Sequence, residues 1–375
     1  MEEFLSNYIV RITALSPIYI GSGESVGKKQ YILNPKTHKV IIPDLEKMYQ
    51  AISRQGKEKE YIAYMSDNRG YPLGSFLRDI GFSFKDYEKW KAYEMEGGEI
   101  LSKKGKEVPK DISCFVKDPY GKPYIPGSSL KGLIRTALIM YEYKKNPEQF
   151  ANIKEEIKRK SAEKARRNTF LNKEILDLEA EIFHTLNKNE KKNNAVNCNL
   201  SGLIVSDSKP VSTDDLILVQ KIDKKVDGST GSLPIMREAI RPGTVIEASI
   251  TIDSKVCPYT VQDIMKALKE YRRICDEYFN KKFSLESEDE KIVWIGGGTG
   301  FVSKTIIYAL FENEGLKVTD NIFKQTLSDT IYRKHLHDKD VRQYKIAPHT
   351  AKCTMYNGKI YDMGRAKIQF LRRTK

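Results

Sequence analysis

Two glycine-rich segments contain the residues whose spacing could support binding of a phosphate. The first, Gly21-Ser22-Gly23, follows a strand pattern and continues to Gly27. The dinucleotide-binding fingerprint is G-x-G-x-x-G opening an apolar helix, whereas here the third glycine comes one position late and no helix pattern follows. We therefore expect either a turn whose amides approach a backbone phosphate or an ordinary hairpin turn.

The second segment, Gly296-Gly297-Gly298-Thr299-Gly300, is followed by Lys304 and Thr305. A nucleotide-binding P-loop places its lysine directly after the last glycine. Three residues separate Gly300 from Lys304, so this lysine would not reach the β- and γ-phosphates of a nucleotide. A glycine run is costly in chain entropy and indicates close backbone approach, either to RNA or to a packed neighbour. Lys304 and the net positive charge favour RNA.

A third candidate lies at the start of a helix pattern. Ser128, Lys131 and Arg135 fall at i, i+3 and i+7 on one polar stripe. A helix N-terminus with free amides, a hydroxyl and two cations can bind phosphate. The alternative is an N-cap at Ser128 or Ser129 with ordinary surface cations. Four further cations are candidate RNA contacts, and the alternative for each is ordinary surface charge: Arg237 and Arg241, which flank Glu238, and Arg365 and Lys367 on the last predicted strand.

No catalytic arrangement stands out among the nucleophiles, histidines and carboxylates. Metal-independent RNA cleavage needs a histidine as general base, and His38 in the N-terminal hairpin is the one candidate. His335 and His337 could lie on one side of a strand, but His349 follows at no recognised ligand spacing. The five cysteines are far apart and form no C-x-x-C, which indicates buried thiols in a reducing compartment. We predict no metal and no cofactor.

The charge balance indicates a polyanionic partner. The sequence has 64 Lys and Arg against 50 Asp and Glu, a net charge of +14. Such a surplus raises the local concentration of nucleic acid and speeds its association. No run approaches the roughly 20 apolar residues of a membrane-spanning helix, and the acidic N-terminus differs from a signal peptide. We predict a cytoplasmic protein with no membrane partner.

The elements that must position these residues are mixed. Alternation predicts strands at 8–15 and 244–252, and 202–207, 216–222 and 363–370 are also strand-like, with a hairpin over 31–42. Helical spacing predicts helices from 128 and over 261–278, the latter with Ile264, Met265, Leu268, Tyr271 and Ile274 inward. With helical insertions at 44–113 and 146–198 set aside, the order is the βαββαβ of a ferredoxin-like, RRM-like α+β fold. We predict an N-terminal half at 1–225 and a C-terminal half at 226–375.

 The C-terminal half either forms a second, degenerate ferredoxin-like unit or completes the first.

Several of these segments together resemble the RAMP superfamily of CRISPR proteins. The residues that carry the resemblance are Pro17 to Gly23, Tyr124 to Arg135 (YIPGSSLKGLIR), Gly202 to Asp207 (GLIVSD), Gly296 to Thr305 (GGGTGFVSKT) and Met363-Gly364. Within that superfamily, the late glycine loop ending in Lys-Thr and the long chain are most similar to the fifth subunit of the type III-A Csm complex. The resemblance implies ferredoxin-like folding and RNA contacts at Gly21 to Gly23, Ser128 to Arg135 and Gly296 to Thr305.

The resemblance also implies a function. Such a subunit is a non-catalytic RNA-binding part of a ribonucleoprotein. It contacts the 3′ region of the guide (CRISPR) RNA, caps the filament of backbone RAMP subunits and supports 3′-end maturation of the guide with host ribonucleases. The aspartate with which backbone subunits cut target RNA has no convincing match, since Glu24 comes early and Asp44 late. The alternative function is a metal-independent endoribonuclease that acts on CRISPR repeat RNA through His38.

Overall fold

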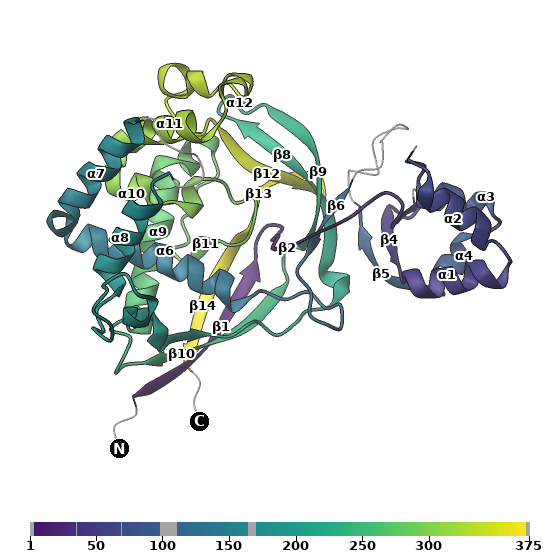
Figure 1. Ribbon diagram of the computed structural model, residues 1–375, viewed down its shortest axis with the longest axis horizontal. Helices are drawn as coiled ribbons and strands as arrows, with labels where there is room; N and C mark the ends of the chain where they lie inside the picture. Colours follow the sequence, from purple (N-terminus) through teal and green to yellow (C-terminus); the bar gives the residue numbers. More distant parts are fainter. Residues whose placement is uncertain (1–3, 35, 69, 98–110, 164–169, 373–375) are drawn as a thin grey trace.

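The computed structural model describes residues 4–34, 36–68, 70–97, 111–163 and 170–372. Two β-sheets and the helices around them form the main body, and a small helical body projects from one end of it (Figure 1). The chain crosses between the sheets several times. This mixed architecture confirms the predicted α+β class.

The first sheet, sheet A, is antiparallel with the strand order β11-β14-β1-β10-β7. β1–α6–β7 and β10–α9–β11 are the two halves of a split βαβ arrangement, which confirms the predicted ferredoxin-like fold. The last strand, β14, is inserted between β11 and β1. The elements of this unit are β1 (Leu5–Ala14), α6 (Gly127–Lys145), β7 (Leu203–Val205), β10 (Val245–Asp253), α9 (Val261–Tyr278), β11 (Ile292–Trp294) and β14 (Arg365–Arg372).

Sheet A forms because its strands alternate apolar and polar residues, so that one face packs under α6 and α9. Val10 and Ile12 of β1 are buried in the main core with Leu268 of α9. Thr260 begins α9 with a capping box, which fixes the predicted helix start. One inward residue was predicted wrongly, because Met265 is 46% exposed and lies on the solvent side of α9.

The second sheet, sheet B, runs in the order β2-β6-β9-β8-β5-β4-β3, with β12 paired to β8 and β13 paired to β12. Most pairs are antiparallel, while β5–β8 and β6–β9 are parallel. The predicted hairpin is confirmed as β3 and β4. The strands of sheet B are β2 (Gly21–Val26), β3 (Ile32–Asn34), β4 (Lys39–Pro43), β5 (Lys91–Glu96), β6 (Ile112–Phe115), β8 (Leu216–Lys225), β9 (Thr230–Ile240), β12 (Thr350–Tyr356) and β13 (Lys359–Asp362).

The predicted insertions are helical over most of their described length. The first forms the projecting body, with its own core around Met48, Leu77 and Trp90, but it ends in two strands of sheet B that were not predicted. The second contributes two helices beside α6. Residues 98–110 and 164–169 of these predicted insertions lie outside the described residues. The helices are α1 (Leu45–Arg54), α2 (Glu58–Ser66), α3 (Leu73–Asp79), α4 (Phe84–Tyr87), α7 (Ala151–Ala162) and α8 (Asn172–Phe183).

Three short helices follow the glycine loop: α10 (Ile307–Phe311), α11 (Gly315–Thr326) and α12 (Asp329–Lys334). The predicted strand through His335 and His337 is wrong, since His335 caps α12 and His337 begins a 3₁₀ turn. Over the described ranges, no helix is long and apolar enough to cross a membrane. Both sheets combine strands from either side of residue 225, and the predicted division into two halves stays a prediction.

Candidate nucleic-acid interface

The glycine segments meet where the chain crosses between the sheets, and Tyr19 lies at their centre. The Gly297 N–H donates a hydrogen bond to the Tyr19 carbonyl at 2.6 Å. A Cβ on Gly296 would lie 2.2 Å from that carbonyl oxygen, and a Cβ on Gly21 would lie 2.4 Å from the Tyr19 hydroxyl. A Cβ on Gly364 would lie 2.3 Å from the carbonyl oxygen of Ile295. These glycines are therefore required for close packing of the protein against itself.

The later part of the loop borders charged side chains instead. Gly298 and Gly300 have φ angles of +78° and +91°, a region that glycine adopts without strain. A Cβ on Gly298 would lie 2.5 Å from Nη1 of Arg237, and one on Gly300 would lie 4.0 Å from Lys352. Of the two predicted alternatives, packing on a neighbour is confirmed for Gly296 and Gly297, whereas an RNA contact stays a prediction for Gly298 and Gly300, which lie beside cations.

Three cations lie on one face of sheet B. Arg237 of β9 is opposite Val219 of β8, while Lys352 of β12 is opposite Asp223 of β8. Since side chains alternate along a strand, residues 219, 221 and 223 share a face, and Lys221 lies between the other two cations. The opposite face packs into the main core. We call Lys221, Arg237 and Lys352, with the bordering loop residues Gly298 to Gly300, the basic surface.

The charges of the basic surface are only partly compensated. Asp223 is 3.0 Å from Nζ of Lys352 and 3.8 Å from Nζ of Lys221. Arg237 lies over the ring of Tyr19, 4.9 Å from its centre, and has no ion-pair partner among the described residues. Three cations therefore face one carboxylate. Burial, together with the neighbouring Lys352, lowers the pKa of Lys221, which shows that its charged form lacks sufficient solvent and counter-charge.

Two flanking elements extend this arrangement. Gly21, Ser22 and Gly23 are exposed at the start of β2, an edge strand of sheet B, and not in the turn that was predicted. Lys304 follows the glycine loop with an exposed side chain and no ion pair within the described ranges. Thr299 accepts a hydrogen bond from the Ser303 hydroxyl at 2.9 Å, which folds the loop back on itself. Thr305 caps the short turn that follows.

The start of α6 is different. The Gly127 N–H donates to Oδ1 of Asp207 at 2.7 Å, so a carboxylate already occupies the amide end of this helix. The predicted N-cap is wrong, because Pro126 holds that position and makes no side-chain cap hydrogen bond. We call Ser128, Ser129, Lys131 and Arg135 the α6 site.

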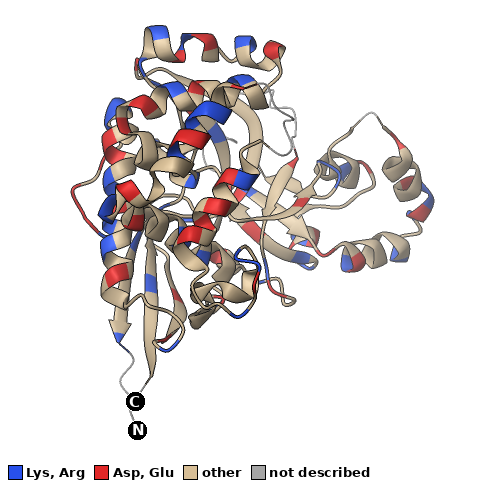
Figure 2. Cartoon of the chain, turned by 60° about the vertical axis from the view of Figure 1, so that its left-hand side comes forward, with Lys and Arg blue, Asp and Glu red and all other residues tan. Residues whose placement is uncertain are grey.

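Both cations of the α6 site have partners within the protein. Lys131 donates from Nζ to the Leu203 carbonyl at 2.7 Å, and burial lowers its pKa. Arg135 donates to Oε2 of Glu179 at 2.8 Å and lies over the ring of Phe183. They line a cavity of about 370 Å³ beside α8. Figure 2 shows the general pattern, with Lys and Arg alternating with Asp and Glu along the helices.

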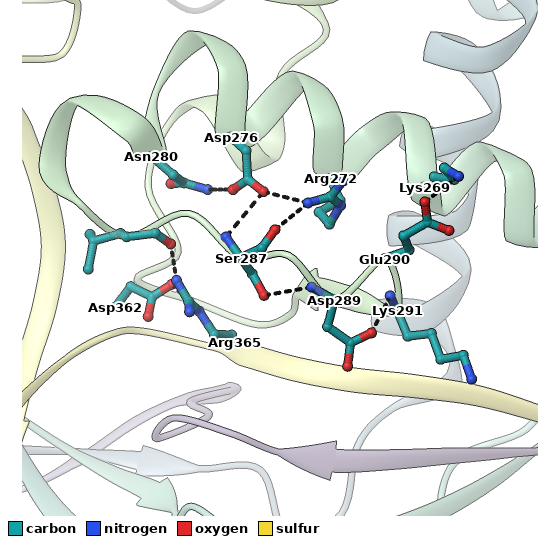
Figure 3. A network of polar contacts seen from close by, with 11 residues as sticks. Lys269, Arg272, Asp276, Asn280, Ser287, Asp289, Glu290, Lys291, Asp362 and Arg365 are labelled. Carbon is teal, nitrogen blue, oxygen red and sulfur yellow. Dashed lines mark hydrogen bonds and ion pairs between the residues drawn. The ribbon is translucent and has the colours of Figure 1, made fainter.

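The remaining predicted cations are bound into the fold elsewhere. Arg241 contacts the Asp214 carbonyl and lies 3.9 Å from Glu96. Arg365 pairs with Asp362 at 3.0 Å and also donates to a backbone carbonyl, and Lys367 pairs with Asp289 at 2.8 Å. Figure 3 shows Arg365 within a polar network that joins α9, the segment before β11 and the start of β14.

Comparisons with known proteins assign this chain to a family. The family model described as the RAMP superfamily matches residues 11–303, which include both glycine segments and the start of α6. The chain belongs to the RAMP superfamily. This confirms the resemblance predicted from the sequence motifs.

Individual RAMP relatives match nearly the whole chain. A Csm5 protein of Mycobacterium tuberculosis is 26% identical over 398 aligned residues, which cover 99% of this chain and 100% of the relative. A Csm5 protein of Streptococcus thermophilus is 27% identical and covers 82% of each chain. Among solved structures, a chain of a cryo-EM type III-A Csm–crRNA–target RNA complex has a TM-score of 0.65 at 20% identity, covering 96% of this chain and 100% of that chain. The crystal structure of T. onnurineus Csm5 has a TM-score of 0.62 at 18% identity, covering 95% and 99%.

Sequence reasoning missed three members of the interface in this RAMP protein: Tyr19, Lys221 and Lys352. Lys221 and Lys352 lie 131 residues apart in the chain and meet only because β12 pairs with β8. The local sequence provided little signal, because 216–219 are all apolar and buried and do not alternate. Tyr19 stands inside the first motif, and its backbone carbonyl leaves no room for a Cβ on Gly296.

Proposed function

We propose that this chain is the fifth subunit of a type III-A Csm complex and binds the guide RNA through the basic surface. The proposal rests on three cations that face one carboxylate on sheet B. Beside them lies a glycine loop whose lack of side chains leaves the cations uncovered. The similarity to Csm5 proteins over nearly the whole chain supports the complex.

The chemistry of this surface suits the phosphates of a single strand. Arg237 presents a planar fork of donors that fits phosphate oxygens, and Lys221 and Lys352 add point charges. Because these cations are partly buried, they have already lost part of their hydration. A bound phosphate would supply counter-charge in place of that water. Exposed edge residues Gly21 to Gly23 would contact the backbone through their amides. Such contacts recognise the sugar–phosphate chain and give little sequence preference.

The proposed role in the complex is structural. The subunit contacts the 3′ region of the guide, caps the filament of backbone RAMP subunits and supports 3′-end maturation without cutting RNA itself. The position of His38 supports this. His38 is exposed in the β3–β4 turn, at the opposite edge of sheet B from β2 and its glycines. Recruitment of host ribonucleases stays a prediction.

The test measures RNA binding with the backbone subunit present. An end-labelled single-stranded RNA carrying a repeat-derived segment is titrated with the assembled subunits across a salt series. We expect tight binding that weakens steeply with salt, and an intact RNA in both EDTA and magnesium. Lys269→Gln serves as the control for glutamine substitutions on the basic surface, since Lys269 of α9 pairs with Glu290, away from that surface. Salt-independent binding, or cleavage lost in His38→Ala, would contradict the proposal.

A further inference from the structure

A buried cluster of two histidines and one aspartate lies beyond the glycine loop and has no part in the proposed RNA contacts. Nδ1 of His337 is 2.8 Å from Oδ2 of Asp340, and Nδ1 of His349 is 2.5 Å from Oδ1 of the same carboxylate. One ligand atom from each residue lies within 4.8 Å of the others. Asp340 is fully buried and His349 nearly so, while the side chain of His337 is 15% exposed.

The local backbone holds these side chains in place. Leu336, directly before His337, has a φ of +58°, and Lys345 has a φ of +54°. Between them the chain forms a 3₁₀ turn and the π-helical turn η10 (Asp340–Tyr344). Left-handed conformations cost non-glycine residues of order 1–3 kcal/mol each, and they collect at ligand-binding and functional sites. The strained backbone therefore indicates that the fold holds these three side chains in one arrangement for a function.

Aromatic side chains surround the cluster and limit its contact with water. The ring of Tyr344 stacks on His349 with centres 4.6 Å apart, and the ring of Phe323 lies 4.7 Å from that of His337. Tyr332 lies 5.9 Å from His337 on the other side. An apolar shell of this kind around a donor set raises the electrostatic attraction for a cation.

The spacing of the cluster fits one tetrahedral cation. Two imidazoles bound to zinc at about 2.0–2.1 Å have ring centres roughly 5 Å apart, and those of His337 and His349 are 5.5 Å apart. Neighbouring ligand atoms on such an ion are ~3.3 Å apart, so each nitrogen–oxygen contact would open by less than about 1 Å. Two imidazoles and one carboxylate form a recognised donor set for zinc and related divalent metals.

We propose that His337, Asp340 and His349 bind one divalent cation of the zinc class. Binding displaces the protons that the two Nδ1 atoms share with the carboxylate, and the metal takes their place between the three ligands. Among the described residues, no fourth His, Cys, Asp or Glu joins the group, which leaves one coordination position to water. The cation links η10 to the start of β12 and so fixes the segment that leads to Lys352.

The experiment measures zinc binding by the purified full-length chain. The protein is stripped with a chelator, and zinc is titrated in competition with a chromophoric chelator. We expect one equivalent to bind, and His337→Ala to weaken it at least tenfold, because loss of even an outer partner of a metal ligand costs 10–100-fold. His335→Ala is the matched control. Its ring centre is 6.5 Å from that of His337, and it is not among the three ligands.

Folding is checked separately, so that a misfolded variant cannot imitate a lost ligand. His337→Gln is compared with His337→Ala, and the Tm of each is measured in EDTA and with one equivalent of zinc. The wild-type chain and His335→Ala should gain Tm with zinc, whereas both His337 variants should not. Cobalt bound in place of zinc should show the visible bands of a tetrahedral site. No stoichiometric binding, or equal binding by the His335 and His337 variants, would overturn the proposal.

Discussion

The basic surface and the α6 site differ in the partners of their cations. At the α6 site, Lys131 donates to a backbone carbonyl and Arg135 pairs with Glu179, while Asp207 occupies the amide end of the helix. On the basic surface, one carboxylate serves Lys221 and Lys352, and Arg237 has only an aromatic ring. The comparison teaches that the availability of a cation for RNA depends on its partners in the fold more than on its spacing in the sequence.

The largest expected effect comes from a substitution that disrupts the packing that supports the basic surface. Gly296→Ala places a Cβ 2.2 Å from the Tyr19 carbonyl oxygen at a φ of +84°. Backbone strain and overpacking together should lower the free energy of unfolding by about 3 kcal/mol or more. Gly228→Ala is the control, with a φ of +83° but nothing within 4 Å, and should cost only about 1 kcal/mol. Equal losses for the two variants in urea unfolding would show that the close approach to Tyr19 is not required.

The next effect concerns RNA affinity. Arg237→Gln with Lys352→Gln should weaken binding of single-stranded RNA at least tenfold, because two partly buried phosphate contacts are lost. The slope of log affinity against log salt should fall by about 1.4, or about 0.7 for each contact. Filter binding at several salt concentrations measures both quantities. An unchanged slope would mean that these side chains do not contact phosphate.

A smaller effect concerns pH. Burial lowers the pKa of Lys221 below its ordinary value near 10.5, and a phosphate would raise it again. Because the bound state then has the higher pKa, this contact contributes fully below the lowered pKa of the free protein, and its contribution is lost as pH rises from there through the higher pKa of the bound state. RNA affinity should therefore fall a few-fold on approaching pH 10.5, and Lys221→Arg should remove that fall. A 2′-fluoro RNA avoids alkaline hydrolysis, and a fall that persists in the arginine variant would contradict this assignment.

The smallest expected effect is at the α6 site. Lys131→Gln with Arg135→Gln should change RNA affinity by less than about twofold, because both cations are held within the protein. The same variant should lose stability by about 0.2–1 kcal/mol for the Arg135–Glu179 pair, which is partly exposed. Titration with RNA and urea unfolding of one preparation give both values. A tenfold loss of affinity without a loss of stability would reverse the comparison between the two regions.

Local patterns predicted the elements of this fold well where one face of an element is buried. Alternation located β1 and β10, and helical spacing located α9. The split βαβ order then followed from these few elements. Strand β9 was missed because its first half, 230–235, is largely exposed and lacks an apolar face. Strands β12 and β13 were missed because they follow a series of short helices and turns.

The site was predictable only in part, for a different reason. Glycine spacing excluded nucleotide chemistry and located the loop, but it could not distinguish Gly296, which packs on Tyr19, from Gly298, which borders Arg237. The N-cap prediction at Ser128 was wrong because Asp207, 80 residues along the chain, takes the first helical amide. Contacts of that sequence separation leave no local pattern.

The most direct test of the central claim is to locate the guide RNA on this chain in the assembled complex. Photo-crosslinking of a guide with 4-thiouridine near its 3′ end, followed by mass spectrometry of the peptides, identifies the residues that touch RNA. We predict crosslinks in β8, β9, β12 and the loop from Gly298 to Lys304, with few at 128–135. Crosslinks concentrated at 128–135, with none on the basic surface, would contradict the account.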